Sequence, residues 1–556
     1  MLSNTLANLL VSDRADSIVV TDDGLTFGQF KTDVGNAVAT LSIQDKTRVA
    51  LFEPDTYSFM VWLFAAWQLK RSVLLPPEME TFNQANFSNY ILIGSFEGAD
   101  MSAWGEPKSP AQFEALDLDA EVLEVYTSGS TGEPTKITKK LWQLENEIKA
   151  AEFTFGPSIS VDRLFTGSAS HQHFFGLPFR VLWPLARGSR IARSLIAYPH
   201  EWDTSIPQVF VTSPSFLKRV AQTSNIQKQS NPDFISCFAA GGILSAEISK
   251  EIRDLTANYP YEIYGSSETG HISYRQLPGD VWKMQQGVEF KKPIAETLEI
   301  KSQFLPDDSW FKTADTATES NGSFEIHGRT DTILKIEDKR ISTPQINKAI
   351  LSSCLVAECH ILDLGNGSRD QLSAIVVLDD AGLNLIKRQG KLAAITAIKQ
   401  AMASQVDPVC IPRKWRFISS LPRNSFGKIT KAQCLRLFST PIKSPAIIAA
   451  TTASGVSSFC LDISDNLECL KGHFDKFPLV PGVAQLQWAI DIGLNHFGIT
   501  QRKFSSMEQV KFRDFLKPNQ IIELEITLNS ENNSLKFKYL KGDSIFSTGT
   551  IKFHKD

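Results

Sequence analysis

Small hydroxyl residues and glycines are concentrated in one segment, directly after a β-prone run at 122–125. The segment consists of Thr127, Ser128, Gly129, Ser130, Thr131 and Gly132. Glycines allow successive backbone N–H groups to point inward, and the hydroxyls add donors, which together suit phosphate oxygens. Lys136 follows with a mobile positive charge. We predict a phosphate-binding loop, with a solvated Ser/Gly linker as the alternative. A Walker loop is excluded, because Glu133 follows Gly132 where that motif has lysine.

Four later segments carry groups that suit a nucleotide and its metal ion. They are 264–270 (Tyr-Gly-Ser-Ser-Glu-Thr-Gly), 313–315 (Thr-Ala-Asp), 328–331 (Gly-Arg-Thr-Asp) and 421–428 (Leu-Pro-Arg-Asn-Ser-Phe-Gly-Lys). Tyr264 can offer its ring face to a base. Glu268 can hold Mg²⁺ against phosphate, because a carboxylate is a hard oxygen ligand for a hard ion. The ammonium group of Lys428 can neutralise charge where a carboxylate approaches a phosphate.

The order and spacing of these motifs resemble the adenylate-forming superfamily, which includes acyl-CoA synthetases, aryl-acid ligases and the adenylation domains of peptide synthetases. The resemblance covers roughly the first three quarters of the chain. It implies ATP and Mg²⁺ as cofactors, a carboxylic acid as substrate and a phosphopantetheine thiol as acceptor. It implies an ATP site formed by Thr127, Ser128, Gly129, Ser130, Thr131, Gly132, Lys136, Gly241, Tyr264, Gly265, Ser267, Glu268, Asp315 and Arg329.

Within that site, the resemblance implies separate roles for several residues. Ser267 stands where the family has threonine and would donate to the α-phosphate. Asp315 would accept from both ribose hydroxyls, although Ala314 replaces the usual glycine before it. Arg329 would lie near ribose and phosphate, and Lys428 would be the catalytic lysine. A surface salt bridge is the alternative for Asp315 and Arg329, and a solvated loop is the alternative for Lys428.

The resemblance also implies an acyl pocket and a hinge. His173 and Phe174 fall in a His-x-x-Gly segment beside the acyl site, and His173 could instead be a packed core histidine. Gly242 would flank the acyl group, and His271 would border the pocket. Asp331 falls at the hinge before the small subdomain. Farther on, Asp338 stands where many thioester-forming members carry glycine. This departure weakens the expectation of thioester formation more than that of adenylate formation.

The last hundred residues resemble a different family. The segment 471–483 resembles the Gly-His-Phe…Pro…Pro-Gly-Val signature of hotdog-fold hydroxyacyl thioester dehydratases, and is most similar to those of aryl polyene-type systems. His473 would be the catalytic histidine. Val483, Leu486, Ile490 and Leu494 recur at helical spacing, which predicts a central helix. The position of the paired acid is Gln487, whose amide is no general acid–base at neutral pH.

Composition limits the remaining classes of function. A net charge of −4 predicts no general affinity for nucleic acid or for an anionic membrane. The longest apolar run, 59–67, is too short to span a bilayer and predicts a buried helix. The N-terminus lacks a basic region and does not resemble a signal peptide. Seven cysteines without a CxxC pair indicate reduced thiols, so we expect a cytoplasmic protein.

Helix-like and strand-like segments alternate in the first part of the chain, which predicts an α/β fold. The expected strands include 17–20 and 48–52, and the expected helices 33–41 and 58–69. We predict an α/β large subdomain at 1–330 and a mobile α+β small subdomain at 331–438. A linker at 439–456 and an α+β hotdog domain at 457–556 follow. The length of 556 residues fits about three or four domains.

These observations predict an ATP-dependent carboxylic acid ligase fused to a dehydratase-like hotdog domain. The fusion indicates acyl carrier protein as the acceptor, and the aryl polyene resemblance indicates an aromatic acid. Two alternatives stay open: a ligase that uses free coenzyme A, and a ligase whose hotdog part is a binding and dimerisation scaffold without dehydratase activity. We expect a homodimer through the hotdog domain, because a single copy would leave a sheet edge open.

Overall fold

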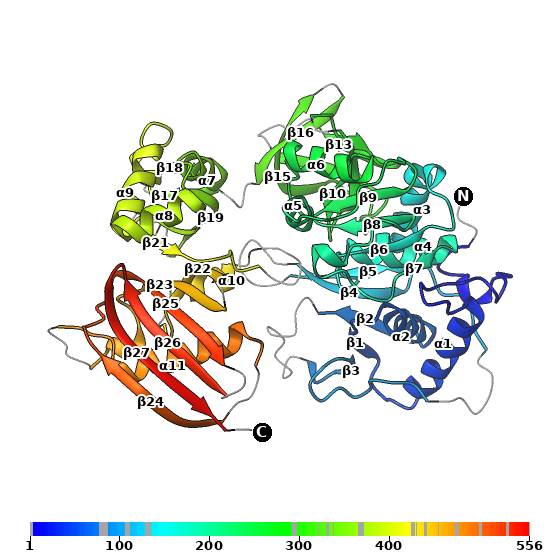
Figure 1. Ribbon diagram of the computed structural model, residues 1–556. Helices are drawn as coiled ribbons and strands as arrows, with labels where there is room; N and C mark the ends of the chain where they lie inside the picture. Colours follow the sequence, from blue (N-terminus) through cyan, green and yellow to red (C-terminus); the bar gives the residue numbers. More distant parts are fainter. Residues whose placement is uncertain are drawn as a thin grey trace. The chain divides into compact units, whose positions relative to one another are not determined.

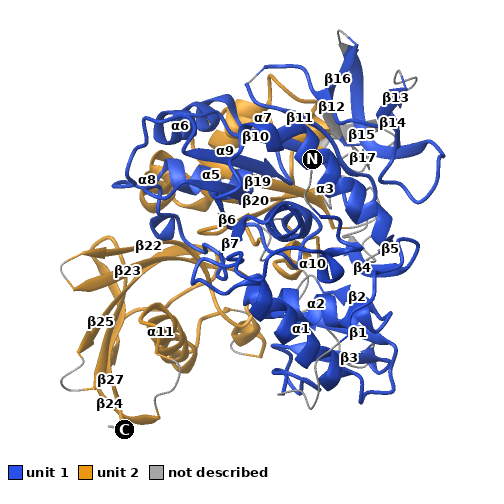
Figure 2. Ribbon diagram, turned by 90° about the vertical axis from the view of Figure 1, so that its right-hand side faces the viewer, with its two compact units in different colours: residues 1–330, 424–428 blue, residues 331–423, 429–556 orange. Residues whose placement is uncertain are grey.

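The computed structural model forms two compact units, which Figure 2 shows in separate colours. The first covers 1–330 and the second covers 331–423 and 429–556. The structure describes the chain except for residues 1–3, 77–86, 106–111, 128–134, 278, 292–296, 321, 330–332, 337–338, 365–371, 424–428, 430, 439–441, 454, 473–476, 500–502, 530–532 and 555–556. For residues 127, 135, 320, 327–328, 333–336, 339–342 and 432 it describes the backbone alone.

The first unit begins with a five-stranded sheet in the order β3-β1-β2-β4-β5 (Figure 1). Its strands are β1 (Arg48–Phe52), β2 (Ser72–Leu75), β3 (Tyr90–Gly94), β4 (Glu121–Thr127) and β5 (Thr135–Lys140). The first four are parallel, whereas β5 runs antiparallel to β4. Helices α1 (Phe27–Leu41) and α2 (Thr56–Gln68) supply much of the core, and the apolar run 59–67 is fully buried within α2.

A seven-stranded sheet follows, in the order β12-β11-β10-β9-β8-β6-β7. Its strands are β6 (Leu164–Gly167), β7 (Arg190–Ile191), β8 (Gln208–Thr212), β9 (Ile235–Ala240), β10 (Tyr261–Ser266), β11 (Gly270–Arg275) and β12 (Lys283–Met284). The run from β10 to β7 is parallel, and β11 turns back antiparallel to β10. The associated helices are α3 (Leu141–Phe155), α4 (Trp183–Arg187), α5 (Pro214–Ala221) and α6 (Ala246–Thr256).

A small antiparallel sheet completes this unit, in the order β13-β14-β15-β16. Its strands are β13 (Val288–Lys291), β14 (Thr297–Ser302), β15 (Phe311–Ser320) and β16 (Ser323–Arg329). The predicted α/β class is therefore confirmed for this region. The strand expected at 17–20 is wrong, because only an isolated bridge between Val19 and Thr26 forms there.

The second unit opens with the pair β17 (Ile333–Ile336) and β18 (Lys339–Ser342), and then forms a three-stranded sheet. That sheet consists of β19 (Val356–Asp363), β20 (Leu372–Leu378) and β21 (Lys414–Phe417). Its helices are α7 (Thr343–Leu351), α8 (Asp380–Gln389), α9 (Lys391–Met402) and α10 (Lys431–Arg436). The mixture of separate helices and a small mixed sheet agrees with the predicted α+β class.

The last part is a six-stranded antiparallel sheet in the order β22-β23-β25-β26-β27-β24, which curves around helix α11 (Figure 1). Its elements are β22 (Ala446–Ala453), β23 (Val456–Ile463), α11 (Gly482–His496), β24 (Phe504–Phe512), β25 (Gln520–Asn529), β26 (Ser534–Lys541) and β27 (Ser544–Phe553). A helix held by a curved antiparallel sheet is the predicted hotdog arrangement.

Two expectations for this part need correction. Residues 446–453, which we assigned to a linker, form β22, because they pair with β23 along the length of the strand. The predicted central helix is confirmed, and Leu486, Ile490 and Leu494 pack partly buried against the core, but Val483 does not belong to the packed face. Gln485, Trp488, Ala489, Ile492 and Gly493 are its buried residues, whereas Val483 is 74% exposed.

The small mixed sheet region and the hotdog region share one hydrophobic core. Ile448, Cys460 and Ile521 from β22, β23 and β25 lie in the same buried cluster as Ile386 of α8 and Ile398 of α9. Lys391 Nζ also lies 2.5 Å from Asp462 Oδ2, whose side chain is 1% exposed. The second unit is therefore a joint structure, and a cut between its two regions would expose apolar surface.

Among the helices of the described residues, none is long and apolar enough to cross a lipid bilayer.

Candidate active site

The candidate site is organised by the hairpin of β10 and β11, whose strands pair with an irregularity between Tyr264 and Gly265. A side chain at Gly265 would overlap the carbonyl oxygen of Gly270 on the opposite strand, so only glycine fits there. Gly270 itself has a φ of 71°, in the left-handed region. The hairpin therefore closes at a point where two glycines let the backbones approach, and the residues around its turn are placed by that geometry.

Three predicted nucleotide-binding residues converge on one side of this hairpin. The Tyr264 hydroxyl donates to Asp315 Oδ2 at 2.5 Å, and Arg329 Nη1 lies 3.7 Å from Asp315 Oδ1. Burial raises the pKa of Tyr264 well above its ordinary value, and the Asp315 charge adds to the shift. Asp315 and Arg329 are register partners on β15 and β16. The structure thus brings together a phenol ring, a carboxylate and a guanidinium that lie 51 and 14 residues apart.

The predicted phosphate loop connects the antiparallel strands β4 and β5. Of its residues, Ser128, Gly129, Ser130, Thr131 and Gly132 lie outside the described part of the chain, as does the side chain of Thr127. Lys136 Nζ lies 3.3 Å from Glu124 Oε2, with 40% of the lysine side chain exposed. Burial opposes the ionisation of Glu124, but hydrogen bonds from Arg48 and Tyr90 and the nearby positive charges lower its pKa overall. Lys136 is therefore held at the base of the loop by a buried carboxylate.

The turn between β10 and β11 carries Ser267 and Glu268, both of them half-buried. Its geometry is set by Ser266 and Thr269, whose hydroxyl groups each accept from the backbone N–H of the other residue. No cluster of three or more metal-ligating side chains occurs among the described residues. Glu268 alone nevertheless fits Mg²⁺ bound to a nucleotide, because that ion takes one or two carboxylates and completes its shell with phosphate oxygens and water.

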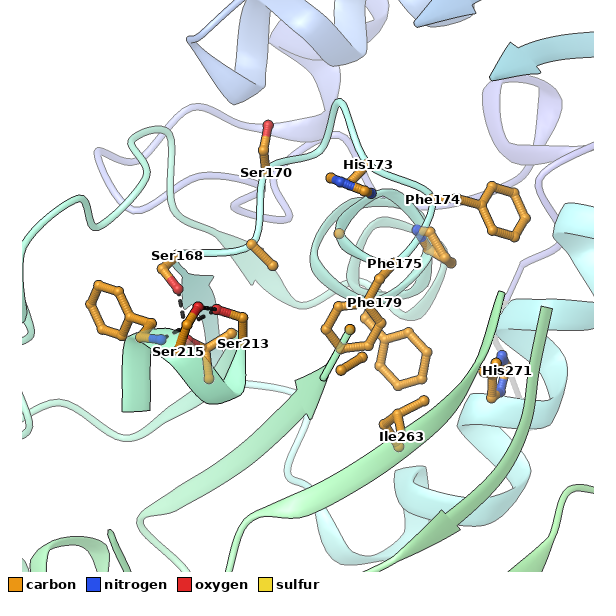
Figure 3. A pocket seen from close by; sticks show the side chains of 18 of the residues that line it. Ser168, Ser170, His173, Phe174, Phe175, Phe179, Ser213, Ser215, Ile263 and His271 are labelled. Atoms are coloured by element: carbon orange, nitrogen blue, oxygen red, sulfur yellow. Dashed lines mark hydrogen bonds between the residues drawn. The ribbon is translucent and has the colours of Figure 1, made fainter. Parts of the chain in front are cut away.

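A pocket of about 350 Å³ adjoins this turn (Figure 3). Serine hydroxyls line one side, where Ser168 Oγ lies 2.7 Å from Thr212 Oγ1. The apolar wall consists of Phe174, Phe175, Phe179 and Ile263, and His173, Gly241, Gly265, Ser267 and His271 also contribute to the lining. The predicted pocket residues His173, Phe174 and His271 are therefore together. Gly242 is exposed and does not line the pocket, whereas its neighbour Gly241 does.

Two charged residues of this pocket region were missed by sequence reasoning. His271 Nδ1 is hydrogen-bonded to Glu147 Oε2 of α3, and the two side chains are 4% and 1% exposed. Lys139 of β5 is buried, donates to the Glu268 carbonyl oxygen at 2.8 Å and lies 4.9 Å from the centre of the Phe174 ring. Burial lowers the pKa of Lys139 to about 8, although the negative charges of Glu147 and Glu268 act in the opposite direction and raise it. In the sequence, Glu147 could have been noticed as a charged residue among the apolar positions of the helix at 141–155.

Three further predicted residues lie outside the described part of the chain: the hinge Asp331, the catalytic lysine Lys428 and the hotdog histidine His473. Asp338, the departure near the thiol channel, lies outside it too. Their roles stay predictions from the sequence.

On the hotdog helix the structure adds a residue that the sequence reasoning did not consider. Gln487 Nε2 donates to Asp491 Oδ1 at 2.8 Å, one turn farther along α11. Gln487 is exposed and Asp491 half-buried, so this pair is open to water. A carboxylate therefore lies next to the position where related dehydratases carry their acid, although not at that position.

Comparisons with known proteins agree with this arrangement. Residues 80–300 match the family described as AMP-binding enzyme, and residues 451–550 match the ApeI-like family, described as ApeI dehydratase. A malonate–CoA ligase of Arabidopsis thaliana is 23% identical over 448 residues, which cover 69% of this chain and 69% of the relative. A D-alanine–D-alanyl carrier protein ligase of Bacillus cereus is 24% identical over 379 residues, covering 59% and 73% of the two chains.

The fold is shared with solved ligase structures. A benzoate–CoA ligase of Burkholderia xenovorans LB400 superposes with a TM-score of 0.60 at 17% identity, covering 78% of this chain and all of that one. At this identity the likeness concerns the fold alone. This likeness establishes the adenylate-forming fold of the first three quarters, and the match of residues 451–550 to the ApeI-like family, with the curved sheet around α11, establishes the hotdog fold of the last part.

Proposed function

We propose that this chain, which carries an AMP-binding enzyme domain and a C-terminal ApeI-like dehydratase (hotdog) domain, is an ATP-dependent carboxylic acid ligase that transfers its acyl group to a pantetheine thiol. One observation carries the proposal: the β10–β11 hairpin carries Tyr264, whose hydroxyl donates to Asp315, and also Ser267 and His271, which line an aromatic-walled pocket. A single short segment thus adjoins both a base-and-ribose site and an acyl-sized cavity. Acid–thiol ligases among the relatives support this assignment.

In the first half-reaction the acid's carboxylate oxygen attacks the α-phosphorus of ATP, and the bond to pyrophosphate breaks. Asp315 accepts from the ribose hydroxyls, Arg329 balances its charge, and the Tyr264 ring supports the base. Ser267 donates to an α-phosphate oxygen. Lys428 neutralises the two anions as they approach, where electrostatic stabilisation is strongest. Mg²⁺, held by Glu268, would screen the phosphate charges when bound.

In the second half-reaction the pantetheine thiol attacks the acyl carbon and releases AMP, which gives a thioester. We propose acyl carrier protein as the acceptor, because the fused dehydratase-like domain belongs to a class that acts on acyl thioesters. Free coenzyme A is the alternative acceptor, and ligases of both kinds occur among the relatives. A change of position of the small subdomain about Asp331 would separate the two half-reactions.

For the hotdog part we propose thioester binding, with weak dehydratase activity carried by His473. The exposed pair of Gln487 and Asp491 supports a reduced activity, because the amide stands in the place of the expected acid. A scaffold that binds thioesters and dimerises without catalysis is the alternative, and the exposed side chains on its edge strand β24 favour the dimer.

Acid-dependent release of pyrophosphate tests the ligase. The full-length chain would be incubated with MgATP and a panel of acids that includes malonate, D-alanine, benzoate, cinnamate and straight-chain fatty acids. We expect release with at least one acid class and the same loss in Lys428→Ala for every acid. Absence of acid-dependent release across the panel would overturn the proposal.

The acceptor is tested by following thioester formation with the preferred acid, supplying either coenzyme A or holo acyl carrier protein. A kcat/KM at least tenfold higher for the carrier protein is expected. A preference for coenzyme A would assign the alternative acceptor while leaving adenylate formation intact.

A further inference from the structure

The pair of Glu147 and His271 is a buried polar element in a wall that is otherwise largely aromatic. Glu147 comes from α3 and His271 from β11, so two segments 124 residues apart place it. The ring centre of Phe179 lies 5.0 Å from that of the imidazole in an edge-on contact, and Phe304 stacks on the imidazole at 5.2 Å. Two phenylalanine rings thus pack against the imidazole, and both members of the pair line the pocket.

The position of Glu147 depends on a glycine. A side chain at Gly270 would overlap Glu147 Oε1, so the absence of a Cβ at residue 270 leaves the space that the carboxylate occupies. The His271 backbone N–H also lies 3.4 Å from Glu147 Oε2. The carboxylate is therefore held against the β11 backbone at the edge of the pocket rather than at the protein surface.

Each member of the pair keeps one polar atom without a hydrogen-bond partner among the described residues. These atoms are Glu147 Oε1 and His271 Nε2, both fully buried. Buried polar atoms are nearly always hydrogen-bonded, because leaving one unpaired loses its interaction with water without replacement. Two such atoms on adjacent side chains at a pocket wall indicate groups that a bound ligand satisfies.

The chemistry of the two atoms defines what they can bind. Carboxylate Oε1 can only accept, and the Nε2 atom of a neutral imidazole whose Nδ1–H faces a carboxylate accepts as well. A hydroxyl or an amino group can donate to these acceptors. A second carboxylate would bring like charge next to Glu147, and a methyl group would leave both atoms unpaired. The phenylalanine walls favour a flat, apolar body carrying that donor.

We propose that Glu147 and His271 select, among aromatic carboxylic acids, those that carry a hydroxyl or amino donor on the ring. This inference rests on the proposed function, since it assigns the substrate class of the same pocket. Phe174, Phe179 and Ile263 contact the ring, and Glu147 Oε1 accepts from its donor. Lys139, buried beside Phe174, balances the charge that Glu147 brings into the pocket.

The test compares matched acids on the full-length chain. Benzoate and cinnamate would each be supplied unsubstituted and with a hydroxyl, amino or methyl group at each ring position, and kcat/KM would be measured by pyrophosphate release. We expect at least one hydroxyl or amino acid to exceed its methyl isostere by 10- to 100-fold, the range for a lost hydrogen bond to a buried polar group. Calorimetric binding of the same acids with AMP gives a readout independent of turnover.

Variants then assign the preference to the pair. Glu147→Gln is expected to reduce the hydroxyl-to-methyl ratio of kcat/KM at least tenfold. Glu251→Gln on α6, an exposed carboxylate, is the control and should leave the ratio unchanged. Should Glu147→Gln melt at a lower temperature than wild type, His271→Gln provides the second variant, with the same expected loss of preference.

The outcomes separate this inference from the proposed function. Acid activation with equal kcat/KM for hydroxyl, amino and methyl acids would overturn the inference and leave the ligase intact. A preference that survives both Glu147→Gln and His271→Gln would overturn it as well. Absence of activation by every acid would instead overturn the proposed function.

Discussion

The ligase pocket and the hotdog helix both carry a pair of hydrogen-bonded polar side chains, in opposite surroundings. Glu147 and His271 are 1% and 4% exposed and enclosed by phenylalanine rings. Gln487 and Asp491 form a similar contact on α11, where the glutamine is exposed. Water can satisfy the open pair, so its geometry demands no ligand. The enclosed pair is shielded from bulk water by its burial, which makes its unpartnered atoms an indicator of a bound substrate group.

The largest effect is expected from Lys428→Ala, which should reduce pyrophosphate release by 10²–10³, equivalent to about 3–4 kcal/mol of transition-state stabilisation. This substitution should separate the two regions, because it should abolish ligase activity and leave any dehydratase activity of the hotdog region unchanged. Lys431→Ala, at an exposed position of α10, is the control. Release within threefold of wild type would show that Lys428 is not the catalytic lysine.

The buried amine of Lys139 gives a pH signature to the enclosed site. Its folded-state pKa of about 8 lies below the ordinary 10.5, so between these values the folded chain binds fewer protons than the unfolded chain. This group therefore destabilises the fold fully below about pH 8 and less as the pH rises to 10.5. Between pH 7 and 10 the unfolding free energy of wild type should rise by about 2–3 kcal/mol relative to Lys139→Met. The unfolding free energy of both proteins would be measured by urea denaturation across this pH range. The same pH dependence in both would contradict a lowered pKa of Lys139.

The hairpin that connects the nucleotide and acyl sides can be disturbed by one methyl group. Gly265→Ala would force its Cβ into the Gly270 carbonyl oxygen, and overpacking of this kind destabilises by about 1–3 kcal/mol. Thermal unfolding and pyrophosphate release should both suffer. Gly242→Ala is the matched control, because its Cβ would meet only Pro214, at 3.8 Å. Equal behaviour of the two variants would show that the close approach at Gly265 is not needed.

The hotdog sheet ends at β24, where Phe504 and Met507 are each 49% exposed. If two copies pair there, replacing both by lysine should halve the mass in light scattering, because charges on an edge strand oppose pairing. Ile243→Lys, at a 90% exposed position of the first unit, is the control. A dimeric mass after the double substitution would place the interface elsewhere. We prefer substitution to removal of the hotdog region, because a cut at 439–456 would separate β22 from its sheet and expose the core shared with α8 and α9.

The smallest effect is expected at the open pair. Gln487→Glu should raise the turnover of 3-hydroxyacyl carrier thioesters by the full-length chain, since it restores an acid to the helix position that lacks one. Asp491→Asn should lower any residual turnover, while His473→Ala should remove it. Enoyl product that is unaffected by His473→Ala would show that the hotdog signature was misread.

Much of the fold could be predicted from the sequence, because it rests on local patterns. The run 48–52 is β1 as expected, and the helix expected at 58–69 is α2, two residues longer at its start. The strand expected at 17–20 failed because its pairing is a single bridge to Thr26. β22 was mistaken for a linker because the whole stretch 439–456 was judged by its Ser, Thr, Ala and Pro content, although the isoleucines and threonines of 446–453 favour a strand and pair with β23.

The residues of the candidate site likewise fall into those that the sequence predicts and those that only the structure shows. Tyr264, Asp315 and Arg329 could be found because their motifs are contiguous, and the structure brings them together. Glu147 and Lys139 could not, since each is a single charged residue whose partners come from distant segments. Their importance appears only when α3 and β5 pack against the β10–β11 hairpin and exclude water from the side chains.

The most direct test of the central claim is mass-spectrometric detection of the intermediate. The full-length chain with MgATP and a ring-hydroxylated aromatic acid, without any thiol, should accumulate the aryl-adenylate in an amount close to that of enzyme. Addition of holo acyl carrier protein should then convert it to the aryl thioester with an equal amount of AMP. Formation of neither adenylate nor thioester from any acid, while ATP binding persists, would contradict the assignment of this chain as an acid–thiol ligase.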